Sequence, residues 1–172
     1  MNLEYKHLLP GDFDDQSRVW IYQSDRLFTI PEALEIEEML EEFSTSWQSH
    51  GIPVKGFATL FFGRFIVLMA DETATGVSGC STDSSVRLIK NIEQKFKVNL
   101  FNRQLLAFVM KDKIEILPLS QLTYGLEHGF ITKETIYFNN TVLNKNELIN
   151  NWMIPLENSW LKNRIVHDTI NR

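Results

Sequence analysis

The sequence predicts an α+β fold: a ferredoxin-like β-α-β-β-α-β antiparallel sheet with an added hairpin strand and a C-terminal helical extension. Two observations predict it. Two stretches carry apolar residues at helical spacing, and runs rich in β-branched and aromatic residues lie before, between and after them. The chain has 172 residues, of which 44% are hydrophobic and 23% charged, and these are ordinary values for a globular protein with a buried core.

The first strand is predicted at residues 18–24, after a polar loop at residues 10–15. Both predicted helices lie on one face of the sheet, so another segment must cover the opposite face. The alternation of side chains leaves open which set lies on that opposite face. One set is Val19, Ile21 and Gln23, and the other is Trp20 and Tyr22.

The first helix is predicted to begin with a capping box. Thr29 is the expected N-cap, Glu32 stands three residues later, and Pro31 is tolerated in a first turn. Gly51, followed by Pro53, ends the element. The apolar stripe of this helix recurs at spacings of four, three and four residues: Ile36, Leu40, Phe43 and Trp47.

Two β-rich runs, residues 54–62 and 64–70, are predicted to form an antiparallel pair that turns at Gly63. A polar loop is expected at residues 71–82, and the second helix at residues 83–96. The apolar stripe of that helix consists of Leu88, Ile89, Ile92 and Phe96.

The added hairpin is predicted from residues 105–110 and 114–117. The sequence then predicts a short helix at residues 120–128, a short strand at residues 135–138 and a further helix with Asn144 as its N-cap.

These elements divide the chain into an N-terminal arm (1–17), an α+β core domain (18–118) and a C-terminal extension (119–172). The extension packs either on the open face of the core sheet or on a partner subunit. In the second case Trp152 and Trp160 are the expected interface residues, because exposed aromatic side chains mark protein contacts.

The charge is distributed unevenly. Residues 1–50 hold eleven acidic and three basic residues, a net of −8, whereas the whole chain has a net charge of −5. Most of these acids belong to the first predicted helix, whose acidic face is either solvated or matched to a basic face of a partner or a second copy. The acidic balance argues against a nucleic-acid-binding protein.

Targeting and membrane signals are not expected. The first residues are mixed and polar, unlike a signal peptide. The most apolar stretch, residues 57–70, is interrupted by Gly63 and Arg64 and is shorter than the ~20 residues of a spanning helix. The single cysteine excludes an intramolecular disulfide framework, so a cytoplasmic location is expected.

One loop carries the candidate chemistry. Residues 75–85 combine glycines with hydroxyl side chains ahead of a predicted helix, where free N–H groups can bind an anion, and Arg87 adds a guanidinium fork. Alternatively, Thr82 or Asp83 only caps the helix and the serines form a tight turn. The candidate ligand-binding residues are Ser78, Gly79, Cys80, Ser81, Thr82, Ser84, Ser85 and Arg87.

Catalysis at this loop would have to use Cys80, because a thiolate is favoured near a helix N-terminus. No histidine has a diagnostic spacing to it, so no catalytic residue is assigned. The histidines also lack metal-ligand spacing, and we expect neither a metal site nor another cofactor.

A resemblance covers most of residues 18–161. It rests on residues 18–24 (RVWIYQS), 64–68 (RFIVL), 79–87 (GCSTDSSVR) and 135–140 (TIYFNN), with Trp152, Pro155, Ser159 and Trp160. These segments resemble an uncharacterised family of small bacterial cytoplasmic proteins, some of which are labelled "ABC transporter ATPase". No phosphate-loop lysine or ABC signature is present, so we do not expect ATPase activity.

Two functions remain open. The favoured one is a non-catalytic cytoplasmic binding or assembly module that forms a homodimer or binds a protein partner. The alternative is a small-anion or phosphate site, or a thiol-dependent enzyme site, in the Gly/Ser loop at residues 76–87.

Overall fold

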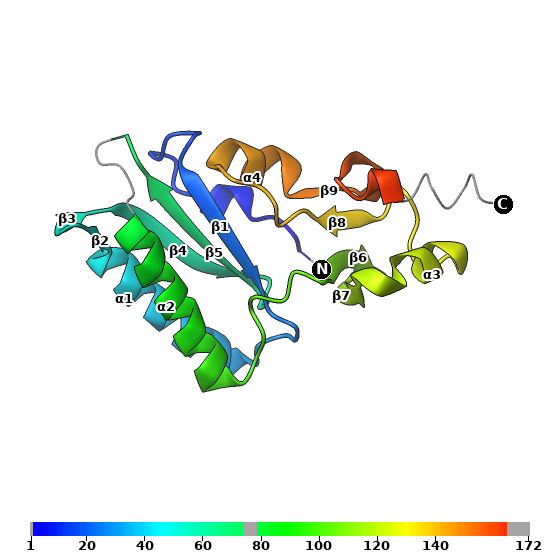
Figure 1. The fold of residues 1–172 in the computed structure, drawn as a ribbon, viewed down its shortest axis with the longest axis horizontal. Coiled ribbons are helices and arrows are strands. Elements are labelled where there is room, and N and C mark those ends of the chain that lie inside the picture. Colours follow the sequence, from blue (N-terminus) through cyan, green and yellow to red (C-terminus); the bar gives the residue numbers. More distant parts are fainter. Residues whose placement is uncertain (1, 74–78, 165–172) are drawn as a thin grey trace.

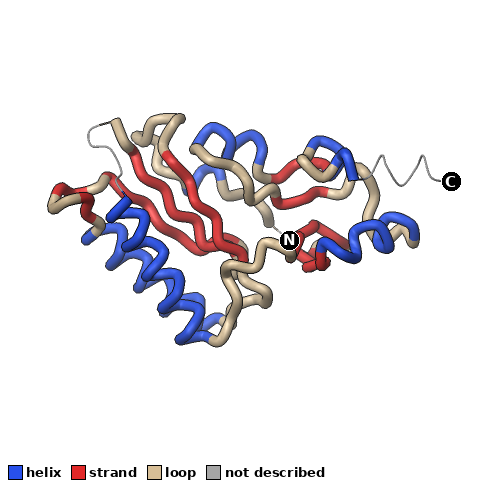
Figure 2. The backbone as a smooth tube through the Cα atoms, viewed as in Figure 1, coloured by secondary structure: helices blue, strands red, loops and turns tan. Residues whose placement is uncertain are grey.

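A computed structural model of the chain describes residues 2–73 and 79–164, with backbone only for residues 79–81. Helices are combined with antiparallel sheets, which confirms the predicted α+β class. Two larger sheets are present, and the connection from residue 97 to residue 104 leads from the first to the second (Figure 2).

The first sheet has three strands in the order β1 (Arg18–Gln23), β5 (Phe65–Asp71) and β4 (Lys55–Phe61). All seven residues of the central strand β5 are buried. The hairpin between β4 and β5 turns at Phe62 and Gly63, which both have positive φ angles of 55° and 61°. This geometry confirms the predicted antiparallel pair and explains why a glycine stands at the turn.

Helices α1 (Ile30–Ser46) and α2 (Gly79–Phe96) cover one face of this sheet (Figure 1). The predicted capping box of α1 is present: the Glu32 N–H donates to Thr29 Oγ1 at 3.4 Å, and the Thr29 N–H donates to Glu32 Oε2 at 2.8 Å. Both predicted apolar stripes face the sheet. Their most deeply buried members are Ile36, Leu40, Ile89 and Ile92.

The other face of the sheet is covered by the N-terminal segment and by helix α4 (Lys145–Asn151) (Figure 1). Val19 and Ile21 lie on this face, while Trp20 and Tyr22 pack with the helices on the opposite face. Val19 and Ile21, and not Trp20 and Tyr22, are therefore the β1 side chains on the face away from helices α1 and α2. The residues that cover this face include Tyr5, Leu9, Phe13, Phe138, Leu148 and Trp152.

The second sheet has the order β7 (Lys113–Pro118), β6 (Leu105–Met110), β8 (Ile136–Phe138) and β9 (Met153–Pro155). Strand β6 therefore lies beside β8 and not beside β1, and the ferredoxin-like arrangement is not confirmed. The outer edge of β1 is taken by another segment: the Val19 N–H donates to the Leu143 carbonyl, and the Lys145 N–H donates to the Ser17 carbonyl, each at 2.9 Å.

This sheet combines strands from both sides of residue 118, where the sequence placed the start of the C-terminal extension. Helix α3 (Leu122–Glu127) lies between β7 and β8 in the chain. The remaining elements are short: strands β2 (Gln48–Ser49) and β3 (Ile52–Pro53), and 3₁₀ helices at Lys6–Leu8, Leu119–Gln121 and Leu156–Asn158.

The two tryptophans expected at an interface have different environments. Trp152 is 0% exposed and packs within the chain, so its assignment to an intersubunit contact is corrected. Its ring contacts aromatic rings from β4, β5, β8, the β4–β5 turn and the N-terminal segment. Trp160 is 44% exposed.

Candidate functional site

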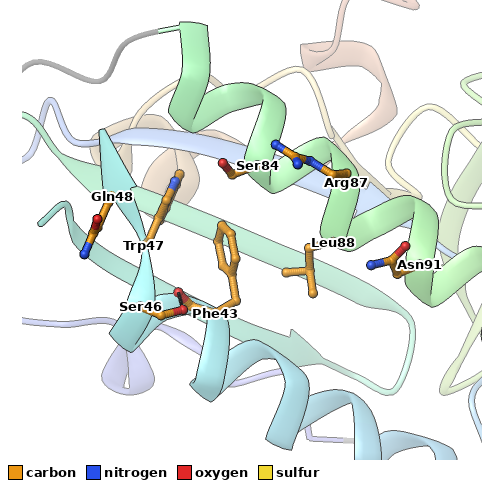
Figure 3. Close-up of a pocket in the computed structure, with 8 residues that line it drawn as sticks. All are labelled: Phe43, Ser46, Trp47, Gln48, Ser84, Arg87, Leu88 and Asn91. Atoms are coloured by element: carbon orange, nitrogen blue, oxygen red, sulfur yellow. Dashed lines mark hydrogen bonds between the residues drawn. The ribbon is translucent and has the colours of Figure 1, made fainter. Parts of the chain in front are cut away.

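A cavity of about 410 Å³ lies between the C-terminal end of α1 and residues 84–91 of α2 (Figure 3). The described residues that line it come from the two helices, from the C-cap residue of α1 and from β2. They are Phe43, Ser46, Trp47, Gln48, Ser84, Arg87, Leu88 and Asn91.

Helix α2 supplies half of this lining because its residues recur at helical spacing. Ser84, Arg87, Leu88 and Asn91 stand three or four positions apart and therefore share one face. The Arg87 guanidinium extends along the helix toward Ser84, and Leu88 faces Phe43 across the cavity (Figure 3). One side of the cavity is therefore polar and cationic, and its floor is apolar.

Helix α1 supplies the aromatic part of the floor. The ring centroids of Phe43 and Trp47 are 4.8 Å apart, and Trp47 is only 2% exposed. Trp47 also lies against Gly56 of β4, where an added Cβ would come within 2.7 Å of its ring. A glycine in β4 is therefore what lets the tryptophan approach the sheet so closely.

Hydroxyl side chains in the last turn of α1 bond to carbonyl groups of the preceding turn. The Ser46 hydroxyl donates to the Glu42 carbonyl at 2.8 Å, and the Thr45 hydroxyl donates to the Glu41 carbonyl at 3.0 Å. Such bonds to the preceding turn are common for serine and threonine within a helix.

Arg87 is the charged side chain of the cavity. None of the described lining residues is acidic, and none of the ion pairs formed by residues 2–73 and 82–164 includes Arg87. Within that part of the chain its guanidinium has no acidic partner, so its N–H donors can bind an anionic ligand or water.

The structure brings two of the predicted site residues, Ser84 and Arg87, into this cavity. Ser85 is instead 0% exposed, and its hydroxyl donates to the Thr82 carbonyl at 2.7 Å. Thr82 lies inside α2 and does not line the cavity. Ser78, also predicted as a site residue, lies outside the described residues, and of Gly79, Cys80 and Ser81 only the helical backbone is described.

Helix α2 begins at Gly79, four residues earlier than the sequence predicted. Cys80 and Ser81 therefore lie in its first turn rather than in a loop ahead of it. Thr82 and Asp83 lie within the helix, so neither is its N-cap. Serine and threonine have low helix propensity, so the sequence predicted that the helix begins only after Ser81 and Thr82.

Sequence reasoning placed Phe43 and Trp47 only in a core stripe and did not select Gln48 or Asn91. The spacing of the two helical stripes gave no signal for the cavity. It forms where two helices far apart in the chain come together, which no local pattern specifies.

The described residues contain no group of three or more histidine, cysteine, aspartate or glutamate side chains that could hold a metal ion. None of the described helices is both long and apolar enough to cross a membrane.

Comparison with protein-family models, curated proteins and solved structures gave no match. The resemblance to small bacterial proteins stays a prediction. The case for a function therefore rests on the cavity itself.

Proposed function

We propose that the protein is a non-catalytic binding module that takes a small organic anion, a carboxylate or a phosphate, in the cavity between α1 and α2. The observation that carries this proposal is Arg87. It has no ion-pair partner among the described residues, and it lies beside polar side chains above an apolar floor.

The donors and the floor suit different parts of one ligand. The planar guanidinium of Arg87 can hold a carboxylate or a phosphate through two parallel hydrogen bonds. Asn91 stands one turn further along the helix and offers a further donor. Phe43 and Leu88 provide apolar contact for the remainder of the ligand.

The proposal assigns no reaction because the described lining lacks an acid or base for proton transfer. It contains no aspartate, glutamate, histidine or lysine. The thiol-dependent alternative at Cys80 stays a prediction, and a Cys80→Ala variant that loses any thiol-dependent activity would support it.

The binding test measures the melting temperature of the protein with inorganic phosphate or benzoate. Both probes carry the charge that Arg87 recognises, and benzoate adds an apolar ring. We expect benzoate to raise the melting temperature of the wild type, because a ligand that binds the native state stabilises it. Arg87→Ala should abolish the rise, and Arg87→Lys should retain part of it.

Lys90→Ala is the matched control, since Lys90 is exposed on α2 and does not line the cavity. It should respond to benzoate as the wild type does. The proposal is wrong if neither probe changes the melting temperature of the wild type, or if Arg87→Ala responds fully.

The homodimer expected from the sequence and the cytoplasmic location both stay predictions. Trp160, at 44% exposure, is the tryptophan that remains available for an interface. Light scattering over a range of concentrations tests self-association, and a monomer at every concentration contradicts it.

A further inference from the structure

A second cavity, of about 360 Å³, lies where the outer edge of β1 meets the second sheet. Residues of β1, the 100–104 connection, the start of β6 and the 137–141 segment line it together with Trp160 and Arg164. It shares no lining residue with the cavity between α1 and α2. The inference drawn from it is therefore independent of the proposed function.

The cavity is cationic. Arg103 and Arg164 both line it, and none of its described lining residues is acidic. Neither arginine belongs to an ion pair formed within residues 2–73 and 82–164. Two guanidinium groups at one concave surface, with no counter-ion among the described residues, favour an anionic ligand.

Aromatic side chains form the walls of this cavity. The rings of Tyr22 and Phe101 meet edge to face with centroids 5.4 Å apart. On another side, the Trp160 indole N–H donates to the Tyr137 hydroxyl at 3.3 Å. Burial raises the pKa of the Tyr22 phenol, and the nearby positive charge of Arg103 opposes that rise.

The side-chain amides of Gln23 and Asn140 also line the cavity. Their hydrogen bonds determine which way round the oxygen and nitrogen of each amide lie. The Trp152 indole can only donate, so Asn140 accepts through Oδ1 at 3.0 Å. Asn140 Nδ2 then donates to Gln23 Oε1 at 2.8 Å, and Gln23 Nε2 donates to the Leu105 carbonyl at 3.1 Å. Each amide nitrogen keeps one further N–H, which this chain of bonds holds in place.

An adjoining cavity of about 250 Å³ extends the space along β1 toward residues 142 and 143. Arg103 lines both cavities, which share Ile21, Tyr22, Arg103, Asn140 and Thr141. The combined space exceeds what a free phosphate fills, and ligand sites of this size take whole small molecules.

We propose that this cavity binds an aromatic anion of the size of a nucleoside monophosphate. Arg103 and Arg164 hold the phosphate, and the ring lies among Tyr22, Phe101 and Trp160. The free N–H groups of Gln23 and Asn140 meet polar atoms of the ligand. Stacking on aromatic rings and bidentate contacts from arginine are the interactions that nucleotides use in proteins.

The test titrates the protein with AMP, adenosine and inorganic phosphate by isothermal calorimetry. AMP should bind at least about tenfold more tightly than adenosine or phosphate, because only AMP engages both the arginines and the rings. In a ¹H–¹⁵N spectrum the indole signal of Trp160 should shift with AMP. This readout needs no variant and therefore does not depend on the folding of one.

Arg103→Ala and Arg164→Ala should each weaken AMP binding at least about tenfold, which equals the loss of one charge-assisted contact. Lys162→Ala, an exposed neighbour of Arg164 outside the lining, is the matched control and should bind AMP as the wild type does. Arg87→Ala should also leave AMP binding unchanged, which separates this site from the cavity between α1 and α2.

The proposal is overturned if AMP does not bind, if adenosine binds as tightly as AMP, or if the Trp160 signal does not move on AMP addition. A loss of AMP binding in Arg87→Ala with no loss in Arg103→Ala would place the AMP site in the other cavity and would overturn this proposal alone.

Discussion

Asp71 ends the central strand β5 and accepts hydrogen bonds from three segments of the chain. Thr73 donates to it from its N–H and its hydroxyl at 3.0 and 2.8 Å, and Lys55 Nζ lies at 3.1 Å. The Asp14 N–H, at 3.4 Å, adds a bond from the N-terminal segment. Burial alone raises the pKa of this carboxyl, but the bonds outweigh it and hold the pKa at about 2.

Replacing Asp71 by asparagine should make the protein less stable in a pH-dependent way. The carboxylate stabilises the native state fully above its ordinary pKa of 3.8, and this contribution is lost as the pH falls toward about 2. At pH 7 we expect Asp71→Asn to cost about 1–3 kcal/mol in free energy of unfolding. Urea unfolding from pH 7 to pH 2 should show the gap to wild type closing below pH 4. The exposed Asp112→Asn variant should follow the wild type throughout, and a gap at Asp71 that does not depend on pH would contradict the argument.

Arg64 is a buried cation at the β4–β5 turn with incomplete hydrogen bonding. It is 6% exposed, and its Nη1 donates to the Ser24 carbonyl at 3.0 Å, but its Nε has no partner among the described residues. Burial lowers the pKa of the guanidinium, although the charges of Glu115 and Asp25 oppose this effect. Its aliphatic stem contributes packing at the turn, while its charge is costly to bury.

Replacing Arg64 by methionine should therefore keep the packing and remove the buried charge. We expect Arg64→Met to stay within about 1 kcal/mol of the wild type. Arg64→Ala should be less stable than Arg64→Met by about 2 kcal/mol or more, because it leaves a cavity. Chemical unfolding of the three proteins measures both differences. Equal losses in the two variants would show that the bond to Ser24 outweighs the packing.

At the scale of elements, local signals decided which predictions succeeded. The capping box at Thr29 and the turn at Gly63 depend on residues within a few positions, and both were predicted correctly. Strand β9 has three residues and pairs only through β8, so no periodicity could reveal it. The strand that pairs with β6 depends on which segment bonds to the outer edge of β1. Residues 143–145 occupy that edge, and no local pattern shows that they do so in place of β6.

The contact between α1 and β4 gives a prediction at this scale. Gly56→Ala should lower the free energy of unfolding by about 1–3 kcal/mol, because the new Cβ overlaps the Trp47 ring and forces it to shift. The shift should also weaken benzoate binding, since Trp47 lines the cavity between α1 and α2. Gly11→Ala is the matched control, because nothing lies within 4 Å of the added atom there. If both alanine variants are equally stable, Trp47 does not need the glycine.

At the scale of the whole molecule, one aromatic core joins the two sheets. Phe61 and Phe65 of the first sheet and Phe138 of the second belong to the same buried cluster. The N-terminal segment contributes Tyr5, whose hydroxyl donates to the Leu148 carbonyl at 2.6 Å.

The candidate sites also form only when segments far apart in the chain pack together. Arg87 could be selected from the sequence as a cation near a helix start, but the neighbours that form its cavity are set by helix packing.

Trp152 stands at the centre of this shared core and gives the prediction for the molecule as a whole. Trp152→Ala should cost about 3–5 kcal/mol, the usual loss for a large buried ring. Because the core is shared, both sheets should lose stability together, and unfolding of wild type and variant should each remain a single transition. Far-UV circular dichroism and tryptophan fluorescence should give coincident curves. The rings that contact Trp152 are those of Tyr5, Phe61, Phe62, Phe65 and Phe138.

Trp152→Phe separates the two contributions of this residue. It keeps most of the aromatic packing but loses the indole donor to Asn140, so it should cost less stability than Trp152→Ala. It should also release the amide chain from Asn140 to Gln23 and weaken AMP binding in the second cavity without changing the benzoate response. Two unfolding transitions in the wild type would show instead that each sheet is stable by itself, and the aromatic core would then be a contact between separate units.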